Sequence, residues 1–111
     1  MTQKDLAERI SEILDSKKGI DIQVVDLEGK TIIADYFVIA TGSSKPHIRA
    51  LTEEVEIRLR EDHKIEPLHT EGRESGRWIL MDYGGVVVHV FHEEDRAFYS
   101  LEKLWQSRKN V

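Results

Sequence analysis

The residues best suited to chemistry in this 111-residue chain start with the turn at Gly42 and Ser43. The turn joins a strand-like run to a helix-like run and presents backbone amides to an anion, as in nucleotidyltransferases. Such enzymes also need two or three carboxylates on neighbouring strands to bind Mg²⁺ for phosphoryl transfer. The later strands offer Asp82 alone, followed by Tyr83 and Gly84. We therefore predict that the protein is not an enzyme. The alternative is a nucleotidyltransferase-like enzyme or a nucleotide-binding relic of one.

The remaining serines and histidines form no stronger site. Ser43 and Ser44 precede a helix, where capping is their usual role, and no Ser-His-Asp order is readable around them. His89 and His92 are three positions apart on a strand and point to opposite faces, and a third ligand is lacking nearby. We interpret His89 as a hydrogen-bonded core residue, and His47 as a surface residue or a partner of the preceding loop. The chain has no cysteine, so we predict no disulfide and no thiolate metal site. With no complete ligand set or nucleotide motif in the sequence, we also predict no metal and no cofactor.

Helical periodicity marks the first element, and β-branched residues mark the second. Thr2 with Asp5 resembles a capping box, and Gly19 is placed to end the helix. Residues 22–27 predict a strand. Residues 35–42 are almost continuously apolar, which indicates an interior strand covered on both faces.

The second half of the chain predicts another helix, a hairpin and a last helix. Residues 46–63 carry an apolar stripe that predicts a helix. An optional short strand follows within residues 64–69, and residues 70–77 are expected to form a loop. Two β-rich runs around Gly84 and Gly85 predict a hairpin. The last helix is expected from about Glu94, with an inner stripe of Phe98, Leu101, Leu104 and Trp105.

The order of these elements predicts an α/β fold: a mixed four- to five-stranded sheet with three packed helices and nucleotidyltransferase-like topology. The helix over residues 46–63 is expected to return the chain parallel to the strand at residues 35–42, by the right-handed crossover rule. We predict a single domain over residues 1–105 and a polar tail over residues 106–111.

Composition and charge narrow the class of partner. The sequence is 40% hydrophobic and 33% charged, and it lacks a membrane-spanning run or a secretory signal, so we expect a cytoplasmic protein. Sixteen basic residues are interleaved with twenty-one acidic ones, for a net charge of −5. A clustered basic surface is what nucleic-acid binding requires. The charge therefore favours a basic protein partner over bare RNA.

The strand from Trp78 carries large apolar side chains on both faces. Alternation places Trp78, Leu80 and Asp82 on one face, and the intervening residues, with Tyr83, on the other. Three helices in so small a domain need not cover both faces, and an uncovered apolar patch around a tryptophan is a binding site. Periodicity alone leaves Trp78 open between core and interface.

Two segments resemble the signature blocks of the bacterial ribosomal silencing factor family, also called Iojap-like proteins. The first is DYFVIATGSSKPHIRAL, residues 35–51, and the second is RWILMDYGGVVVHVFHEEDRAFYSLEKLW, residues 77–105. The resemblance covers the chain from the first helix to Trp105. It implies a nucleotidyltransferase-like fold without an established transferase activity.

The resemblance also implies a partner and a site. Members of the family bind a conserved protein of the large ribosomal subunit, the fourteenth in the usual numbering, and thereby obstruct joining of the small subunit and repress translation. Organellar relatives are linked to assembly of the large subunit. The family's interface falls on Trp78, with Leu80 and Asp82 beside it. Tyr83, Ser44 and His47 complete the partner-binding set that we predict.

A third interpretation, a generic dimerising module, also stays open. It predicts a concentration-dependent melting temperature and no association with ribosomes. The sequence does not decide whether the chain forms a homodimer, and it does not separate a silencing role from an assembly role.

Overall fold

A computed structural model describes residues 1–95, and its elements follow the predicted order. The domain boundary predicted at residue 105 lies outside the described residues, as does most of the helix predicted from Glu94. The described chain enters a helical turn at residues 93–95. Among the described residues, no helix is long and apolar enough to span a membrane. The elements are α1 (Gln3–Ser16), β1 (Ile20–Asp26), β2 (Tyr36–Gly42), α2 (Lys45–His63), β3 (His69–Glu71), β4 (Trp78–Asp82) and β5 (Val86–His92).

Local sequence signals account for both ends of α1. The capping box is present, because Asp5 N donates to Thr2 Oγ1 at 3.0 Å and Thr2 N donates to the Asp5 carboxylate. At the other end Lys18, with φ of 63°, takes the left-handed position that we had expected of Gly19. Gly19 instead donates to Leu14 O at 2.8 Å, and a Cβ at Gly19 would lie 2.9 Å from that oxygen. The glycine is therefore required by close approach and not by its φ angle.

The sheet has five strands in the order β1-β2-β5-β4-β3 and is mixed, which confirms the predicted fold class. β2 pairs with β1 in antiparallel and with β5 in parallel orientation. After α2, the first strand to pair in parallel with β2 is therefore β5 and not the next strand in the sequence. β3 and β4 lie beyond β5 in the sheet. β2 is buried along its whole length, as its apolar run predicts.

The hairpin and the third strand agree with the sequence to different degrees. β4 and β5 pair in antiparallel orientation around Gly84, whose φ is +90°. The short strand, expected within residues 64–69, is centred later, at His69–Glu71, so the loop that follows is shorter than expected. β3 pairs with the end of β4 and forms one edge of the sheet.

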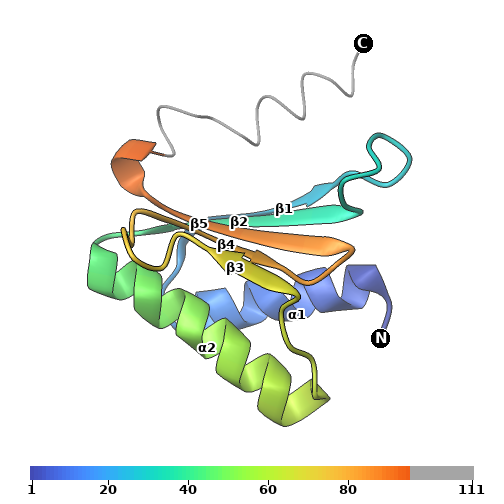
Figure 1. The fold of residues 1–111 in the computed structure, drawn as a ribbon, viewed down its shortest axis with the longest axis horizontal. Helices are drawn as coiled ribbons and strands as arrows, with labels where there is room; N and C mark the ends of the chain where they lie inside the picture. Colours follow the sequence, from blue (N-terminus) through green and yellow to red (C-terminus); the bar gives the residue numbers. More distant parts are fainter. Residues whose placement is uncertain (96–111) are drawn as a thin grey trace.

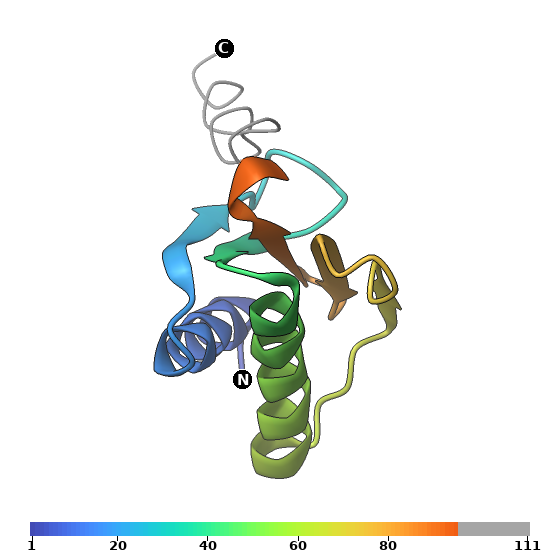
Figure 2. The ribbon, with the colours of Figure 1, turned by 90° about the vertical axis from the view of Figure 1, so that its left-hand side faces the viewer.

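α1 and α2 lie against the same face of the sheet (Figures 1 and 2). The side chains between the helices and this face form the larger apolar cluster, which includes Ile10, Leu51, Ile79 and Met81. A smaller cluster lies on the opposite face and is called the second face below: Val25, Leu27, Ala34, Phe37, Ile39, Val87 and Phe91, with Trp78 and Leu80 packed against it.

Candidate functional site: the second face of the sheet

The second face places two half-buried apolar side chains of β4 beside buried ones. Alternation along β4 leaves Trp78 and Leu80 half-buried, while Ile79 and Met81 are fully buried under the helices. The two predicted site residues therefore share one face, as the sequence pattern predicts. A half-buried tryptophan presents both an anchored and an accessible part, which is typical of binding surfaces.

Aromatic contacts hold the indole of Trp78. The ring stacks on Phe91 of β5, with centroids 4.5 Å apart and planes 25° apart. Its Nε1 donates to Nδ1 of His89 at 3.2 Å. His89 in turn meets Phe37 of β2 edge-on, at a centroid distance of 4.7 Å. Three strands thus contribute to the setting of one side chain.

The ring of His89 is 5% exposed, and burial lowers its pKa to about 4, so it is neutral near pH 7. The interpretation of His89 as a hydrogen-bonded core residue agrees with this geometry. Its role as the acceptor for Trp78 was not foreseen. The cross-strand pairing of Leu80 with His89, and of Trp78 with Phe91, is the register that brings the two rings together.

Asp82 lies at the other end of β4. Trp78 and Asp82 are four residues apart on the strand, which corresponds to about 13 Å. Asp82 Oδ1 accepts from Gly84 N at 2.8 Å, so one carboxylate oxygen shapes the hairpin turn. The side chain is half-buried, so its carboxylate places a negative charge on the same face as Trp78 and Leu80, at the far end of β4.

Tyr83 does not belong to this surface. Its side chain is 8% exposed and packs in the cluster under the helices, on the opposite face from Trp78. The cause is the alternation of the strand, which continues one residue beyond β4. Burial raises the pKa of Tyr83, and its hydroxyl has no hydrogen-bond partner in the part of the chain that the structure describes.

Ser44 and His47 build the junction between the two helices. Ser44 caps α2, and its Oγ accepts from His47 N at 3.2 Å. Nδ1 of His47 accepts from Ser43 N at 3.0 Å, so a neutral ring carries its proton on Nε2, which lies 3.0 Å from Lys17 O at the end of α1. Both ring nitrogens are thus engaged within the chain, which agrees with the interpretation of His47 as a partner of the preceding loop. Ser43 Oγ also lies 3.2 Å from His47 Nδ1, but that nitrogen already accepts from Ser43 N, so the contact gives little support to a nucleophilic role for Ser43.

The register also separates the two halves of the nucleotide-site alternative. Gly42 pairs with His92 at the end of β5, whereas Asp82 pairs with Val87 near its beginning. Five residues of strand correspond to about 17 Å, so the Gly-Ser turn and the carboxylate cannot act on the same phosphate group. A Cβ on Gly42 would lie 2.5 Å from Ile48 Cγ1, so close packing of α2 accounts for this glycine.

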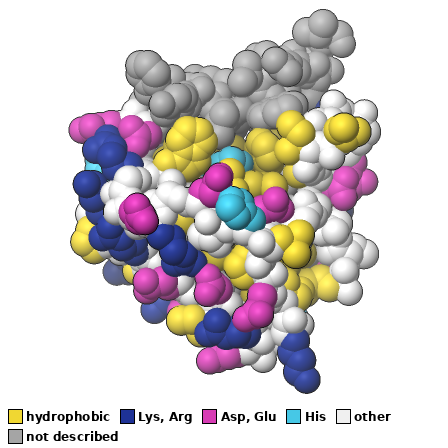
Figure 3. Space-filling view, in the orientation of Figure 1, with side chains coloured by type: hydrophobic (Ala, Val, Ile, Leu, Met, Phe, Trp, Pro, Cys, Tyr) yellow, Lys and Arg dark blue, Asp and Glu magenta, His cyan; other side chains and the backbone are white. Residues whose placement is uncertain are grey.

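The described residues contain no group of three or more His, Cys, Asp or Glu side chains suited to a metal ion. The charged side chains on the face in Figure 3 are mixed, with Lys and Arg interleaved with Asp and Glu over α2. Hydrophobic side chains gather higher on the same view, beside histidine. The described surface therefore agrees with the mixed charge pattern read from the sequence.

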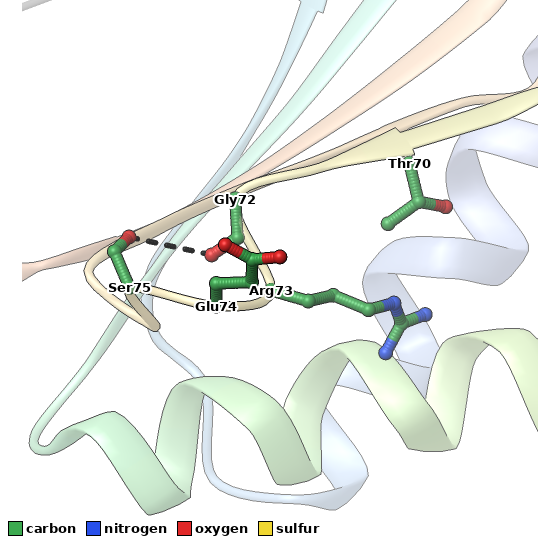
Figure 4. Close-up of a pocket in the computed structure, with 5 residues that line it drawn as sticks. All are labelled: Thr70, Gly72, Arg73, Glu74 and Ser75. Carbon is green, nitrogen blue, oxygen red and sulfur yellow. Dashed lines mark hydrogen bonds between the residues drawn. The ribbon is translucent and has the colours of Figure 1, made fainter.

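An open depression of about 390 Å³ is lined by Thr70 of β3 and by residues 72–75 of the loop that follows (Figure 4). Its polar groups are occupied: Arg73 binds Glu56, and Arg49 donates to the backbone oxygens of Arg73 and Glu74. Ser75 Oγ donates to Gly72 O at 3.3 Å, as the dashed line shows. These bonds anchor the loop that leads into β4, the strand that begins with Trp78.

Arg77, like His89 as the acceptor for Trp78, has a role that the sequence pattern did not indicate. Its guanidinium binds Asp95 through two hydrogen bonds of 3.2 Å and Glu94 through one of 3.3 Å. These hydrogen bonds raise the pKa of Arg77 further. The ion pairs tie the start of β4 to the helical turn after β5, directly beside Trp78. The signal available in the sequence was only opposite charge at the ends of one hairpin.

The fold and this surface define a small α/β domain with a helix-covered sheet face and a second face centred on aromatic side chains. Residues 1–111 match the model of the family described as "Ribosomal silencing factor during starvation". The chain belongs to the ribosomal silencing factor (RsfS) family.

Relatives and a solved structure agree with this assignment. "Ribosomal silencing factor RsfS" of Bacillus subtilis (strain 168) is 39% identical over 105 residues, which is 95% of this chain and 88% of that protein. The crystal structure of protein CV0518 from Chromobacterium violaceum superposes with a TM-score of 0.90 at 35% identity, covering 96% of this chain and 88% of that chain. "Mitochondrial assembly of ribosomal large subunit protein 1" of Mus musculus is 31% identical over 101 residues, 86% of this chain and 43% of that protein.

Proposed function

We propose that the chain binds the large ribosomal subunit through the second face and thereby blocks association with the small subunit, repressing translation. The partner is a basic protein of that subunit, the fourteenth by the family resemblance. The observation that carries the proposal is the half-buried pair Trp78 and Leu80 on the sheet face opposite α1 and α2, in a chain of the ribosomal silencing factor family.

The chemistry of the second face supports a protein partner. Trp78 and Leu80 offer a central apolar contact, and Asp82 offers a negative charge beyond it, which suits a basic partner. An interface of about 1,600 Å² in total is sufficient for specific binding, and a tryptophan at its centre is a frequent hot spot. The relative named for assembly of the large ribosomal subunit agrees with the choice of subunit.

Ser44 and His47 lie at the same end of the sheet as Trp78, because Gly42 pairs with His92 and Trp78 with Phe91. Their side chains hold the backbone at the start of α2 by hydrogen bonds, and that backbone can lie at the border of the interface. Tyr83 is left out of the proposed interface because it is buried on the other face.

Co-sedimentation with isolated large and small ribosomal subunits tests the proposal. We expect the protein to pellet with the large subunit only, and Trp78→Ala to raise the dissociation constant by roughly 30-fold, which corresponds to about 2 kcal/mol. Ile57→Ala is the matched control, since Ile57 is an exposed aliphatic residue of α2. It should bind within about twofold of the wild type.

Two outcomes would count against the proposal. Failure of the wild-type protein to bind either subunit over a range of salt concentrations removes its central claim. A folded Trp78→Ala variant with unchanged affinity moves the interface away from the second face. Blocking of subunit association is then checked directly, by light scattering of mixed subunits with and without the protein.

A further inference from the structure

The pair of Trp78 and His89 contains a buried polar group that packing alone does not explain. His89 lies on β5, a strand with neighbours on both sides, and it is 5% exposed. Its Nε2 is buried and has no hydrogen-bond partner among residues 1–95. An unpartnered buried donor lowers the stability of the fold, a cost that a leucine or methionine at this position would avoid.

The other ring nitrogen shows what the histidine supplies. The indole Nε1–H of Trp78 is a donor only, and it donates to Nδ1 of His89 at 3.2 Å. Nδ1 therefore carries no proton, and the neutral ring keeps its proton on Nε2. Burial disfavours the charged ring, which keeps Nδ1 available as an acceptor near neutral pH.

The hydrogen bond and the ring stack together determine the orientation of the indole. Phe91 contacts one side of the ring at a centroid distance of 4.5 Å, and His89 holds the N–H edge. The N–H edge is therefore turned toward the sheet, and Trp78 stays half-buried. A side chain that is already held in its bound orientation loses less conformational entropy on binding.

We propose that His89 is a positioning residue of the partner-binding surface, whose Nδ1 holds the indole of Trp78 in the orientation that meets the ribosomal protein. The inference rests on the proposed function, because it concerns the affinity of that same surface. It assigns to a buried histidine a role in binding without direct contact with the partner. The histidine is therefore expected to matter more for affinity than for stability.

The experiment compares three substitutions. His89→Leu removes the acceptor, His89→Asn keeps an oxygen acceptor close to the position of Nδ1, and Trp78→Phe removes the donor. In ¹⁵N-labelled protein, the indole N–H signal that disappears in Trp78→Phe belongs to Trp78. We expect its exchange with solvent to be slow in the wild type and in His89→Asn, and at least tenfold faster in His89→Leu.

Affinity for the large subunit is measured on the same proteins. His89→Leu should raise the dissociation constant about tenfold, and His89→Asn by less than about threefold. In the Trp78→Phe background, where no N–H is left to hold, His89→Leu should change the affinity by less than about twofold. Should His89→Leu fail to fold, His89→Met removes the same acceptor with a more adaptable side chain.

The inference is overturned if a folded His89→Leu variant exchanges its indole N–H rapidly yet binds like the wild type. It is also overturned if His89→Leu weakens binding equally with and without Trp78→Phe, since the effect would then be structural. Failure of the proposed function has a different signature. In that case the wild type does not bind the large subunit, or Trp78→Ala binds it as tightly as the wild type does, while the exchange rates are still as predicted. The positioning role then falls with the proposed function.

Discussion

The buried ring of His89 makes stability depend on pH. Its pKa is lowered from 6.5 to about 4 by burial, and the phenyl, indole and aliphatic groups of the described residues around it carry no charge. As the pH falls below 6.5 the unfolded chain takes up a proton on His89, and the folded chain does not until about pH 4. The free energy of unfolding is therefore highest above pH 6.5 and falls as the pH decreases through this window.

Urea unfolding at about pH 7 and about pH 5 measures this dependence. We expect His89 to lower the free energy of unfolding by about 2 kcal/mol between these pH values. His89→Leu is the control, because it keeps every other titrating group. An equal loss of stability in the wild type and in His89→Leu would contradict the prediction.

Tyr83 tests the cost of a second buried polar group. Its hydroxyl is buried under the helices and has no hydrogen-bond partner among the described residues, so Tyr83→Phe should raise the free energy of unfolding by about 1 kcal/mol. Tyr36→Phe is the matched control, because the hydroxyl of Tyr36 donates to Glu28 and its loss should destabilise the fold. Chemical denaturation of the two variants gives opposite signs if the assignment is correct, and a destabilised Tyr83→Phe contradicts it.

At the scale of the elements, both helices end with a lysine in the left-handed conformation. Lys18 follows α1 with φ of 63°, and Lys64 follows α2 with φ of 57°. Lys64 N donates to Arg60 O and Ile65 N to Leu59 O, which completes the C-terminal cap of α2. Glycine adopts this conformation without the steric cost of a Cβ atom.

Lys64→Gly should therefore raise the free energy of unfolding by about 0.5 kcal/mol, as relief of backbone strain outweighs the added freedom of the unfolded chain. Lys64→Ala, which removes the same side chain and keeps the Cβ, should not stabilise the protein. Thermal unfolding of both variants distinguishes conformation from charge. Equal stabilisation of the two would assign the effect to the lysine charge.

The sequence predicted those elements whose signals are local. The apolar run of β2, the capping box of α1 and the turn at Gly84 each depend on neighbours within a few residues, and all are present. Gly19 takes part in the C-terminal cap of α1, as its position predicts, but the residue in the left-handed conformation is Lys18. Glycine is needed at position 19 because a Cβ there would lie against Leu14 O, which the sequence pattern does not indicate.

The candidate site required information that periodicity does not contain. Alternation correctly grouped Trp78 with Leu80, but it could not give the register of β4 against β5. That register brings Nδ1 of His89 to the indole N–H of Trp78. The same register separates Asp82 from Gly42 and so removes the geometry of a nucleotide site. Long-range pairing, and not residue type, decides both points.

At the scale of the whole molecule, charge and apolar contact should act on different steps of binding. The chain carries a net charge of −5, and its proposed partner is basic, so long-range attraction accelerates the encounter. Trp78 and Leu80 act only at contact. The association rate constant for the isolated partner protein should therefore fall several-fold as salt rises through the range in which surface charges become screened, while the dissociation rate changes little.

Two variants separate these steps in stopped-flow or surface-based kinetics. Asp82→Asn removes one charge and keeps the side-chain oxygen that accepts from Gly84, so it should lower the association rate about two- to threefold at low salt and little at high salt. Trp78→Ala should act mainly on the dissociation rate and leave the salt dependence of association as in the wild type. Direct binding to RNA predicts a different result, a steep loss of affinity with salt of several decades, because phosphate contacts release counterions. An association rate indifferent to salt would contradict a basic partner, and a salt response of the steep kind would assign the contact to ribosomal RNA.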